Sequence, residues 1–281
     1  MSMPFYVPPE QVMKDRADFA RKGIARGRSV IVLGYDKGIA FVAENPSRAL
    51  HKVSEIYDRI AFAAVGRYNE FESLRVAGIR YADLRGYSYD RTDVTARALA
   101  NTYAQTLGAV FTQESKPFEI EIVVAEVGLT PDGDQIFRLT YDGSVADEQG
   151  FVVMGGASEK AEERLSTTWR PGLPLGETLR LAVDVLAAGD NGERREIGAA
   201  QLEVAVLDRD RPRRTFRRIV GPLLTRLLSS EDPTADAPLV DEKHPGHPEV
   251  LSGETTDAGS VTGTGSDGED AASDPHPHPP G

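Results

Sequence analysis

The hydrophobic pattern near the start of the chain has a helical period. Pro8 and Pro9 introduce a charged segment that carries a narrow apolar stripe at Met13, Ala17, Ala20 and Ile24. Spacing of this kind places the apolar side chains on one face of a helix. The pattern therefore predicts a helix over residues 9–22, ended by Gly23 and Gly27.

Short β-rich runs separated by turn residues predict strands in groups. The predicted strands cover residues 29–35, 39–44, 53–57, 60–65, 118–127, 135–140, 151–154 and 202–207. Helical patterns fill the intervals between the groups. Two predicted helices have apolar faces from Phe71 to Leu84 and from Leu99 to Val110, with the second capped by Thr92 or Asp93 after the interruption RGYSYDRTD. Two more cover residues 159–168 and 175–188.

The order of these elements is helix, four strands, two helices, three strands, two helices and one strand. Strands in hairpin groups, with helices arriving in pairs, predict an α+β fold in which two antiparallel sheets are covered by helix pairs on both outer faces. Strands and helices do not alternate one by one, so the pattern does not favour a doubly wound parallel sheet.

Composition divides the 281 residues into two parts. Residues 229–281 contain no aromatic residue and hold twelve acidic residues against one lysine, a charge of −11 out of the net −12. Such a segment cannot bury enough apolar surface to offset the roughly 1–2 kcal/mol per residue that ordering costs, so we expect an acidic, disordered tail. The preceding residues are close to neutral and give no argument for nucleic-acid binding.

Several classes of protein are excluded by what the sequence lacks. There is no cysteine, which excludes a disulfide framework, a thiolate metal site and a cysteine nucleophile. The first residues, MSMPFYVPPEQ, have neither the basic nor the apolar region of a secretory signal, and no apolar run approaches the roughly 20 residues of a membrane helix. We expect a soluble cytoplasmic protein that needs no cofactor and no metal.

Five segments, in a fixed order, resemble the proteasome α-subunit family of the N-terminal-nucleophile hydrolase fold. They are PPEQVMKDRADFARKGIARGRSVIVLGYDKGIAFVAEN, HKVSEIYDRIAFAAVGRYNEFESLR, RGYSYDRTDVTARALANTYAQTLG, RLTYDGSVADEQGFVVMGG and LEVAVLDRDRPRRTFRRI. The likeness is greatest to actinobacterial α subunits and spans roughly residues 3–220. It implies a four-layer αββα sandwich, seven-membered α rings that cap rings of catalytic β subunits, and an extra helix before the first strand. We accordingly expect a gate segment at residues 1–8, the αββα domain at 9–228 and the tail at 229–281.

The residue that this chain has at the start of the first strand, compared with catalytic members of the family, argues against catalysis by this chain. Catalytic members expose a threonine at the start of that strand and use its free α-amine as the base. When the turn glycine, Gly38, is aligned, Arg28 takes the position of that threonine. Ser29 is the alternative nucleophile, after self-cleavage of residues 1–28, but the upstream helix then becomes a discarded propeptide. We expect a non-catalytic subunit.

Lys52 is the candidate binding residue. The resemblance places it where α subunits have a lysine that lines a pocket between neighbouring subunits and receives the C-terminal carboxylate of a ring-shaped proteasomal AAA ATPase. A part-buried ammonium suits this role, because a charge-assisted hydrogen bond to a carboxylate contributes about 1.5–3 kcal/mol. The alternative is an ordinary surface lysine at the start of a strand.

The N-terminal residues are candidates for a gate. Phe5, Tyr6 and Val7 can cover their counterparts from other subunits on the ring axis, and Pro8 and Pro9 fix the direction in which the chain leaves the helix. Ordering seven residues costs roughly 7–14 kcal/mol of backbone entropy, whereas burying three apolar side chains contributes about 5–8 kcal/mol. We therefore expect a marginally stable closed gate.

An arginine-rich stretch follows the last predicted strand, at Arg209, Arg211, Arg213, Arg214, Arg217 and Arg218. Interleaved aspartates favour ion pairs within or between subunits over nucleic-acid binding. The expected partners are the proteasome β subunit, other α subunits, the ATPase and unfolded protein substrates in transit, with no nucleic acid and no membrane. A binding protein that uses the acidic tail is a further alternative, although the tail lacks the anchor residues of a specific interface.

Overall fold

The computed structural model describes residues 8–47, 49–156, 158–188 and 194–229. Within these ranges the strands form two antiparallel sheets of five strands each. The first sheet has the order β10 (Phe216–Ile219), β9 (Leu202–Asp208), β2 (Gly38–Glu44), β1 (Val30–Tyr35) and β8 (Phe151–Met154). The second has the order β3 (Val53–Tyr57), β4 (Ile60–Gly66), β5 (Ile120–Glu126), β6 (Gln135–Leu139) and β7 (Val145–Asp147).

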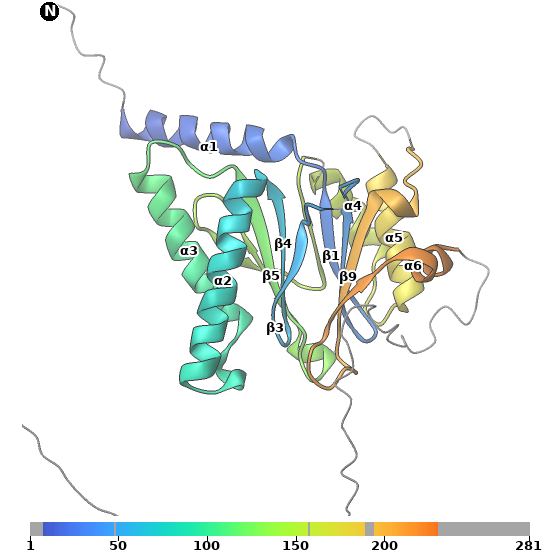
Figure 1. Ribbon diagram of the computed structural model, residues 1–281. Helices are drawn as coiled ribbons and strands as arrows, with labels where there is room; N and C mark the ends of the chain where they lie inside the picture. Colours follow the sequence, from blue (N-terminus) through green and yellow to red (C-terminus); the bar gives the residue numbers. More distant parts are fainter. Residues whose placement is uncertain (1–7, 48, 157, 189–193, 230–281) are drawn as a thin grey trace, which may run out of the picture. The chain divides into compact units, whose positions relative to one another are not determined.

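Helices cover the outer face of each sheet (Figure 1). The second sheet packs against α2 (Tyr68–Ser88) and α3 (Ala96–Gln113), and the first sheet packs against α4 (Ser158–Thr168) and α5 (Leu175–Ala187). The short helix α6 (Gly221–Leu228) lies against α5. An additional helix, α1 (Pro9–Ala25), runs across one end of the sandwich, where it contacts β4 and β5. The predicted α+β sandwich with an N-terminal helix is thus confirmed.

Three apolar clusters explain why the central strands are apolar along their whole length. Successive side chains of a strand point to opposite faces of its sheet. In β1, Val30 and Val32 therefore enter the cluster between the two sheets, whereas Ile31 and Leu33 pack under α4, α5 and α6. A third cluster, which includes Phe62, lies between the second sheet and its two helices. Strands buried on both faces show a continuous apolar run instead of an alternating one.

Three elements were not predicted from the sequence. Strand β7 has no buried residue, so its hydrophobic pattern gives no signal. Strand β10 has the sequence FRRI and was included in the arginine-rich stretch, but its end residues Phe216 and Ile219 are buried. Helix α6 has eight residues, too few for a clear helical period.

Predicted boundaries of the helices α2 and α3 were wrong. Helix α2 continues to Ser88, through the first part of the predicted interruption. Helix α3 begins at Ala96 with Thr95 as its cap, because the Thr95 hydroxyl accepts a hydrogen bond of 3.3 Å from the backbone of Ala98. Thr92 and Asp93, the predicted caps, instead lie in a separate 3₁₀ turn.

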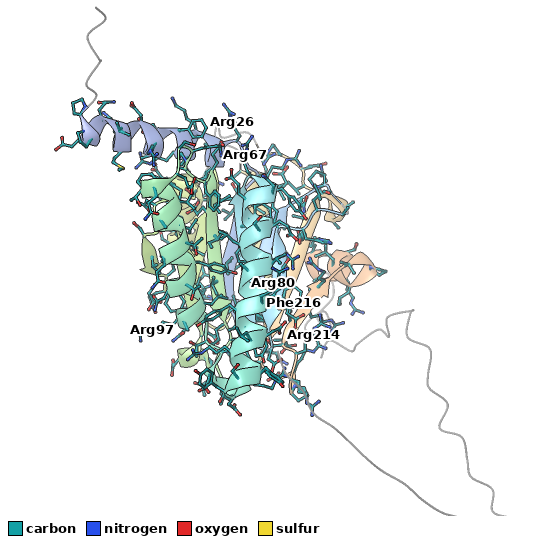
Figure 2. All side chains as sticks on the ribbon, turned by 60° about the vertical axis from the view of Figure 1, so that its left-hand side comes forward. Arg26, Arg67, Arg80, Arg97, Arg214 and Phe216 are labelled. Carbon is teal, nitrogen blue, oxygen red and sulfur yellow. The ribbon has the colours of Figure 1, made fainter. Side chains whose placement is uncertain are left out.

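Helix α1 extends past Gly23, which was predicted to end it. The glycine is needed there for packing, since a Cβ atom on it would lie 2.2 Å from a carboxylate oxygen of Glu119. Glu119 in turn pairs with Lys116 at 3.0 Å and with Arg67 at 3.5 Å. Figure 2 shows Arg67 beside the C-terminal end of α1. This charged cluster fixes the end of the helix that leads into β1.

Some predictions fall outside the described residues. These are the gate contacts of residues 1–7 and the disorder expected for nearly all of the tail, from residue 230 onward. Of the helices that the structure describes, none is both long enough and apolar enough to cross a membrane.

Candidate functional site

Lys52 lies at the crossing from the first sheet to the second. It follows the loop after β2 and immediately precedes β3, so its backbone joins the two layers. Its neighbour across the layers is Glu203 of β9, which pairs with Ala43 of β2 in the sheet register. The loop end, β9 and the start of β1 together form the surroundings of Lys52.

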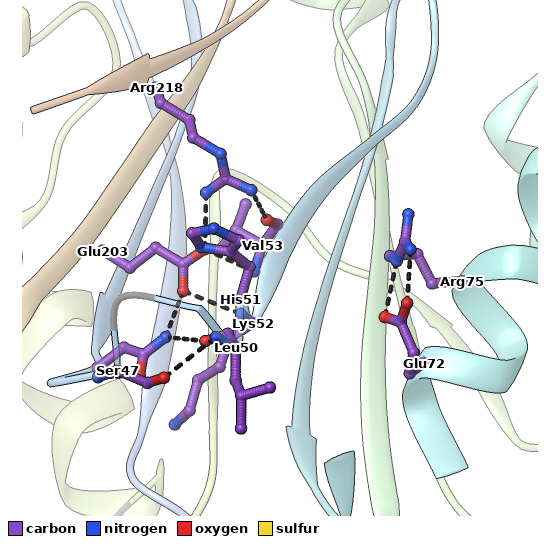
Figure 3. Close-up of polar contacts among 10 residues, drawn as sticks. Ser47, Leu50, His51, Lys52, Val53, Glu72, Arg75, Glu203 and Arg218 are labelled. Carbon is purple, nitrogen blue, oxygen red and sulfur yellow. Dashed lines mark hydrogen bonds and ion pairs between the residues drawn. The ribbon is translucent and has the colours of Figure 1, made fainter. Parts of the chain in front are cut away.

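The Glu203 carboxylate contacts several residues at the end of the loop between β2 and β3, here called the loop end (Figure 3). One oxygen accepts hydrogen bonds from the backbone N–H of Lys52 at 2.9 Å and from the side-chain amide of Asn45 at 2.7 Å. The other accepts from the backbone N–H of Val53 at 3.2 Å and from Arg218 at 2.7 Å. His51 Nδ1 lies 3.2 Å from the same oxygen. One buried carboxylate thus holds three consecutive residues of the loop end.

These contacts decide the charge state of Glu203. Burial by itself raises the pKa of a carboxyl group, because it disfavours the charged form. The hydrogen bonds from Asn45, the Lys52 backbone and Arg218 outweigh burial, and the pKa of Glu203 lies below its usual value. Glu203 is therefore a carboxylate at neutral pH.

The Lys52 side chain extends from the loop end toward the start of β1. Its Nζ donates a hydrogen bond of 2.6 Å to the carbonyl oxygen of Arg28. Burial lowers the pKa of Lys52 to about 8; the carboxylates of Glu203 and Glu44 oppose this change, and Arg28 adds to it. A part-buried ammonium with a pKa of about 8 is mostly charged at pH 7 and can bind a carboxylate there.

Arg28 and Arg195 border the same region. The Arg28 guanidinium lies 3.5 Å from Glu44 of β2, and Arg195 reaches the other oxygen of that carboxylate at 3.1 Å. Two guanidinium groups therefore share one carboxylate near the Lys52 ammonium. The arrangement suits the binding of an anionic group better than that of a cation.

Ser29, the alternative nucleophile, is built into the continuous main chain between α1 and β1. Its nitrogen belongs to the peptide bond with Arg28, so the intact chain offers it no free α-amine to act as a base. Gly155, just after β8, packs closely on it, since a Cβ atom on this glycine would lie 3.0 Å from the Ser29 Cα. Arg28, at the aligned nucleophile position, carries a guanidinium, which has no hydroxyl or thiol to act as a nucleophile.

Of the gate candidates, Pro8 and Pro9 are described and Phe5, Tyr6 and Val7 are not. Pro9 is the first residue of α1, a position where a missing N–H has no consequence. The carbonyl oxygen of Pro8 accepts the backbone N–H groups of Gln11 at 3.0 Å and Val12 at 3.2 Å. The prolines thus set the direction in which the chain enters α1.

The ion pairs predicted for the arginine-rich stretch are confirmed within the chain. Arg209 pairs with Asp134 at 2.7 Å, Arg214 with Glu55 at 2.5 Å and Arg218 with Glu203 at 2.7 Å.

The contacts of Glu203 with the Lys52 loop were missed from the sequence. The available signal was a single acidic residue inside the otherwise apolar run LEVAVL. Across the described ranges, no three His, Asp or Glu side chains come together so as to hold a metal ion.

Comparison with known proteins agrees with this architecture. A family model described as "Proteasome subunit" matches residues 24–207. "Proteasome subunit alpha" of Sanguibacter keddieii is 72% identical over 231 residues, which cover 82% of this chain and 91% of that protein. The proteins of the same name from Xylanimonas cellulosilytica (72% identity; 80% and 95% covered) and Kineococcus radiotolerans (68%; 82% and 99%) are similarly close. The chain therefore belongs to the proteasome subunit family, as an α subunit of the actinobacterial type.

Proposed function

We propose that this chain is the non-catalytic, gating and docking subunit of a cytoplasmic proteasome core. In this proposal, seven copies form each outer ring and admit unfolded substrates to a chamber of catalytic β subunits. A ring-shaped AAA ATPase delivers tagged proteins and docks its C-termini on the α ring. The observation that carries the proposal is the Lys52 ammonium, held part-buried at one end of an α-type sandwich.

Membership of the family means that the chain assembles with other proteasome subunits. Pockets repeated around such a ring engage several ATPase tails at once, so weak single contacts add up to firm docking. One charge-assisted bond contributes about 1.5–3 kcal/mol, which is modest alone and sufficient when repeated. Lys52 supplies one such bond in each subunit.

The gate is proposed at residues 1–8, with Phe5, Tyr6 and Val7 as the covering side chains. Pro8 and Pro9 enter α1 at a fixed angle, so a displacement of that helix redirects the segment before it. The closed form is marginal by the entropy comparison given above. A push from several docked tails is therefore enough to open it.

The alternative, a self-processing hydrolase that uses Ser29, is the weaker proposal. It requires cleavage of the peptide bond between Arg28 and Ser29, and the carbonyl of that bond accepts the Lys52 hydrogen bond. It also discards α1, whose end is fixed by Glu119, Lys116 and Arg67. Both features favour an intact chain.

The test is to co-express the chain with its β partner and to measure native and denatured masses together with ATPase-driven proteolysis. We expect a multi-subunit particle with full-length α chains, in which Lys52→Ala abolishes stimulation by the ATPase and leaves hydrolysis of small peptides unchanged. Lys52→Arg serves as the matched control that keeps the positive charge. A monomer that has lost residues 1–28 would contradict the proposal and support Ser29 as a nucleophile.

A further inference from the structure

We propose that Glu203 is the positioning residue of the Lys52 site: its carboxylate fixes the backbone at Lys52 and Val53 so that the lysine side chain can meet an incoming carboxylate. This inference rests on the proposed function, because it assumes that Lys52 binds a C-terminal carboxylate. It assigns a role to a residue that itself lies too deep to touch such a ligand, with 8% of its surface exposed.

Two backbone hydrogen bonds hold the loop end on Glu203. The backbone N–H groups of Lys52 and Val53 both point at this carboxylate, at 2.9 and 3.2 Å. Two successive N–H groups bound to one carboxylate cannot rotate independently, so the direction in which the Lys52 side chain leaves the backbone is set. The far end of that side chain is held separately by the Arg28 carbonyl at 2.6 Å.

Arg218 completes the support. One of its nitrogens donates to Glu203 at 2.7 Å, and another donates to the carbonyl oxygen of Val53 at 2.6 Å. The pair thus bridges β9 and β10 of the first sheet to β3 of the second. Glutamine at position 203 replaces one carboxylate oxygen by an NH2 group, so Arg218 loses its anionic partner and one of the two backbone N–H groups loses its acceptor, and buried groups of this kind are costly to leave unpaired.

Glu203 also sets the charge balance around Lys52. The ionisable groups that face the ammonium are Glu203 of β9, Glu44 of β2 and Arg28 before β1. His51, from the same loop, and Arg218 of β10 contact Glu203. With glutamine at position 203, the set keeps both guanidinium groups, of Arg28 and Arg218, but loses one of its two carboxyl groups, so the ammonium is less favoured. The pKa of Lys52 then falls further below about 8.

The experiment uses the assembled α–β particle and a peptide of the last ten residues of its ATPase, with the same peptide amidated at its C-terminus as the blank. Affinity is measured from pH 6 to 9 for the wild type and for Glu203→Gln. We expect the midpoint of the pH profile to move downward in the variant, and a downward move of one unit makes binding at pH 8 about fivefold weaker. The amidated peptide binds neither particle measurably.

Three further variants separate this role from a general loss of structure. Glu72→Gln removes the carboxylate of another Glu–Arg pair, with Arg75 at 2.6 Å on α2, and should leave the profile unchanged (Figure 3). Lys52→Arg in the Glu203→Gln background should flatten the profile, because arginine stays charged throughout. His51→Asn removes the neighbouring imidazole and should leave the downward shift caused by Glu203→Gln in place.

The outcomes distinguish the two proposals. If Glu203→Gln keeps the midpoint and affinity of the wild type while Lys52→Ala fails to bind the peptide, the role of Glu203 is overturned and the proposed function stands. Unchanged binding in Lys52→Ala would overturn the proposed function as well. If Glu203→Gln fails to assemble, Glu203→Asp is measured instead. It keeps the charge but shortens the side chain, so we expect weaker binding with a nearly unchanged midpoint, and wild-type affinity would overturn the inference.

Discussion

The ammonium of Lys52 and the carbonyl oxygen of Arg28 are joined by a hydrogen bond of 2.6 Å. Because an ammonium has three N–H donors, this bond to a neutral acceptor leaves two for other partners, as far as the described residues show. The bond also marks where the chain passes from α1 into β1. The same contact therefore bears on both the proposed docking role of Lys52 and the alternative in which Ser29 is a nucleophile.

Docking should weaken as the pH rises. In the proposed function the ammonium form of Lys52 binds the carboxylate, and the pKa of Lys52 without a bound ligand is about 8, so the protonated fraction falls above that pH. Since a bound carboxylate keeps the lysine charged, affinity for an ATPase C-terminal peptide should drop about tenfold between pH 7 and pH 9. Lys52→Arg should give a flat profile in the same titration. A sloping profile in Lys52→Arg would assign the pH dependence to another group.

Ser29→Ala should leave the particle intact and active. The Ser29 nitrogen is held in a peptide bond, so the hydroxyl lacks the α-amine that would activate it. We expect unchanged ATPase-driven proteolysis and an unchanged denatured mass of the α chain. A mass increase of the α chain on substitution, which would signal lost self-cleavage, would contradict this expectation.

Gly78→Ala should destabilise the packing of α2 on α3. A Cβ atom at this position would lie 1.8 Å from the Tyr103 hydroxyl oxygen, which donates a hydrogen bond of 3.0 Å to the carbonyl of Leu74. We expect a loss of about 1–3 kcal/mol in the free energy of unfolding, measured by urea denaturation. Tyr103→Phe removes the nearest clashing atom and leaves Cζ, at 2.8 Å, so the double variant should lose less than the sum of the two single variants. Additive losses would contradict the proposed contact.

Asp134→Asn should lower stability more than a similar change on the surface. Asp134 pairs with Arg209 at 2.7 Å, and the two side chains are only 18% and 11% exposed. Removal of one partner of such a pair costs about 3–5 kcal/mol in the free energy of unfolding. Asp18→Asn, which breaks the exposed pair with Arg21, should cost less than about 1 kcal/mol. Equal losses in the two variants would show that the Asp134 pair is solvated.

Truncation after Ser229 should leave the folded domain unchanged. The removed residues carry a charge of −11 and no aromatic residue, whereas the last residue of α6, Leu228, precedes the cut. We expect the same thermal unfolding midpoint and the same native particle, apart from the lost mass. A lower midpoint would place part of the tail in the domain.

The sequence predicted the layers well because the strands and long helices carry strong periodic signals. Val30, Ile31 and Val32 reveal a strand buried on both faces. The docking role of Lys52, which the family resemblance implies, stays a prediction. The role of Glu203 could not be predicted in the same way, since it depends on a contact with a residue 151 positions earlier in the chain. Strand β10 was hidden because its arginines interrupt the apolar pattern, and Arg218 contacts Glu203 and Val53, which only the folded chain brings near.

The separation of Lys52 and Glu203 by 151 positions along the chain has a consequence for biosynthesis. A chain emerging from the ribosome presents Lys52 early, but Glu203 and Arg218 emerge only near the end of the folded domain. Domains generally fold as units once enough of the chain is available. A nascent or prematurely terminated subunit therefore lacks the contacts that order Lys52, and under the proposed docking role competence for the ATPase arises only when synthesis of the domain is nearly complete.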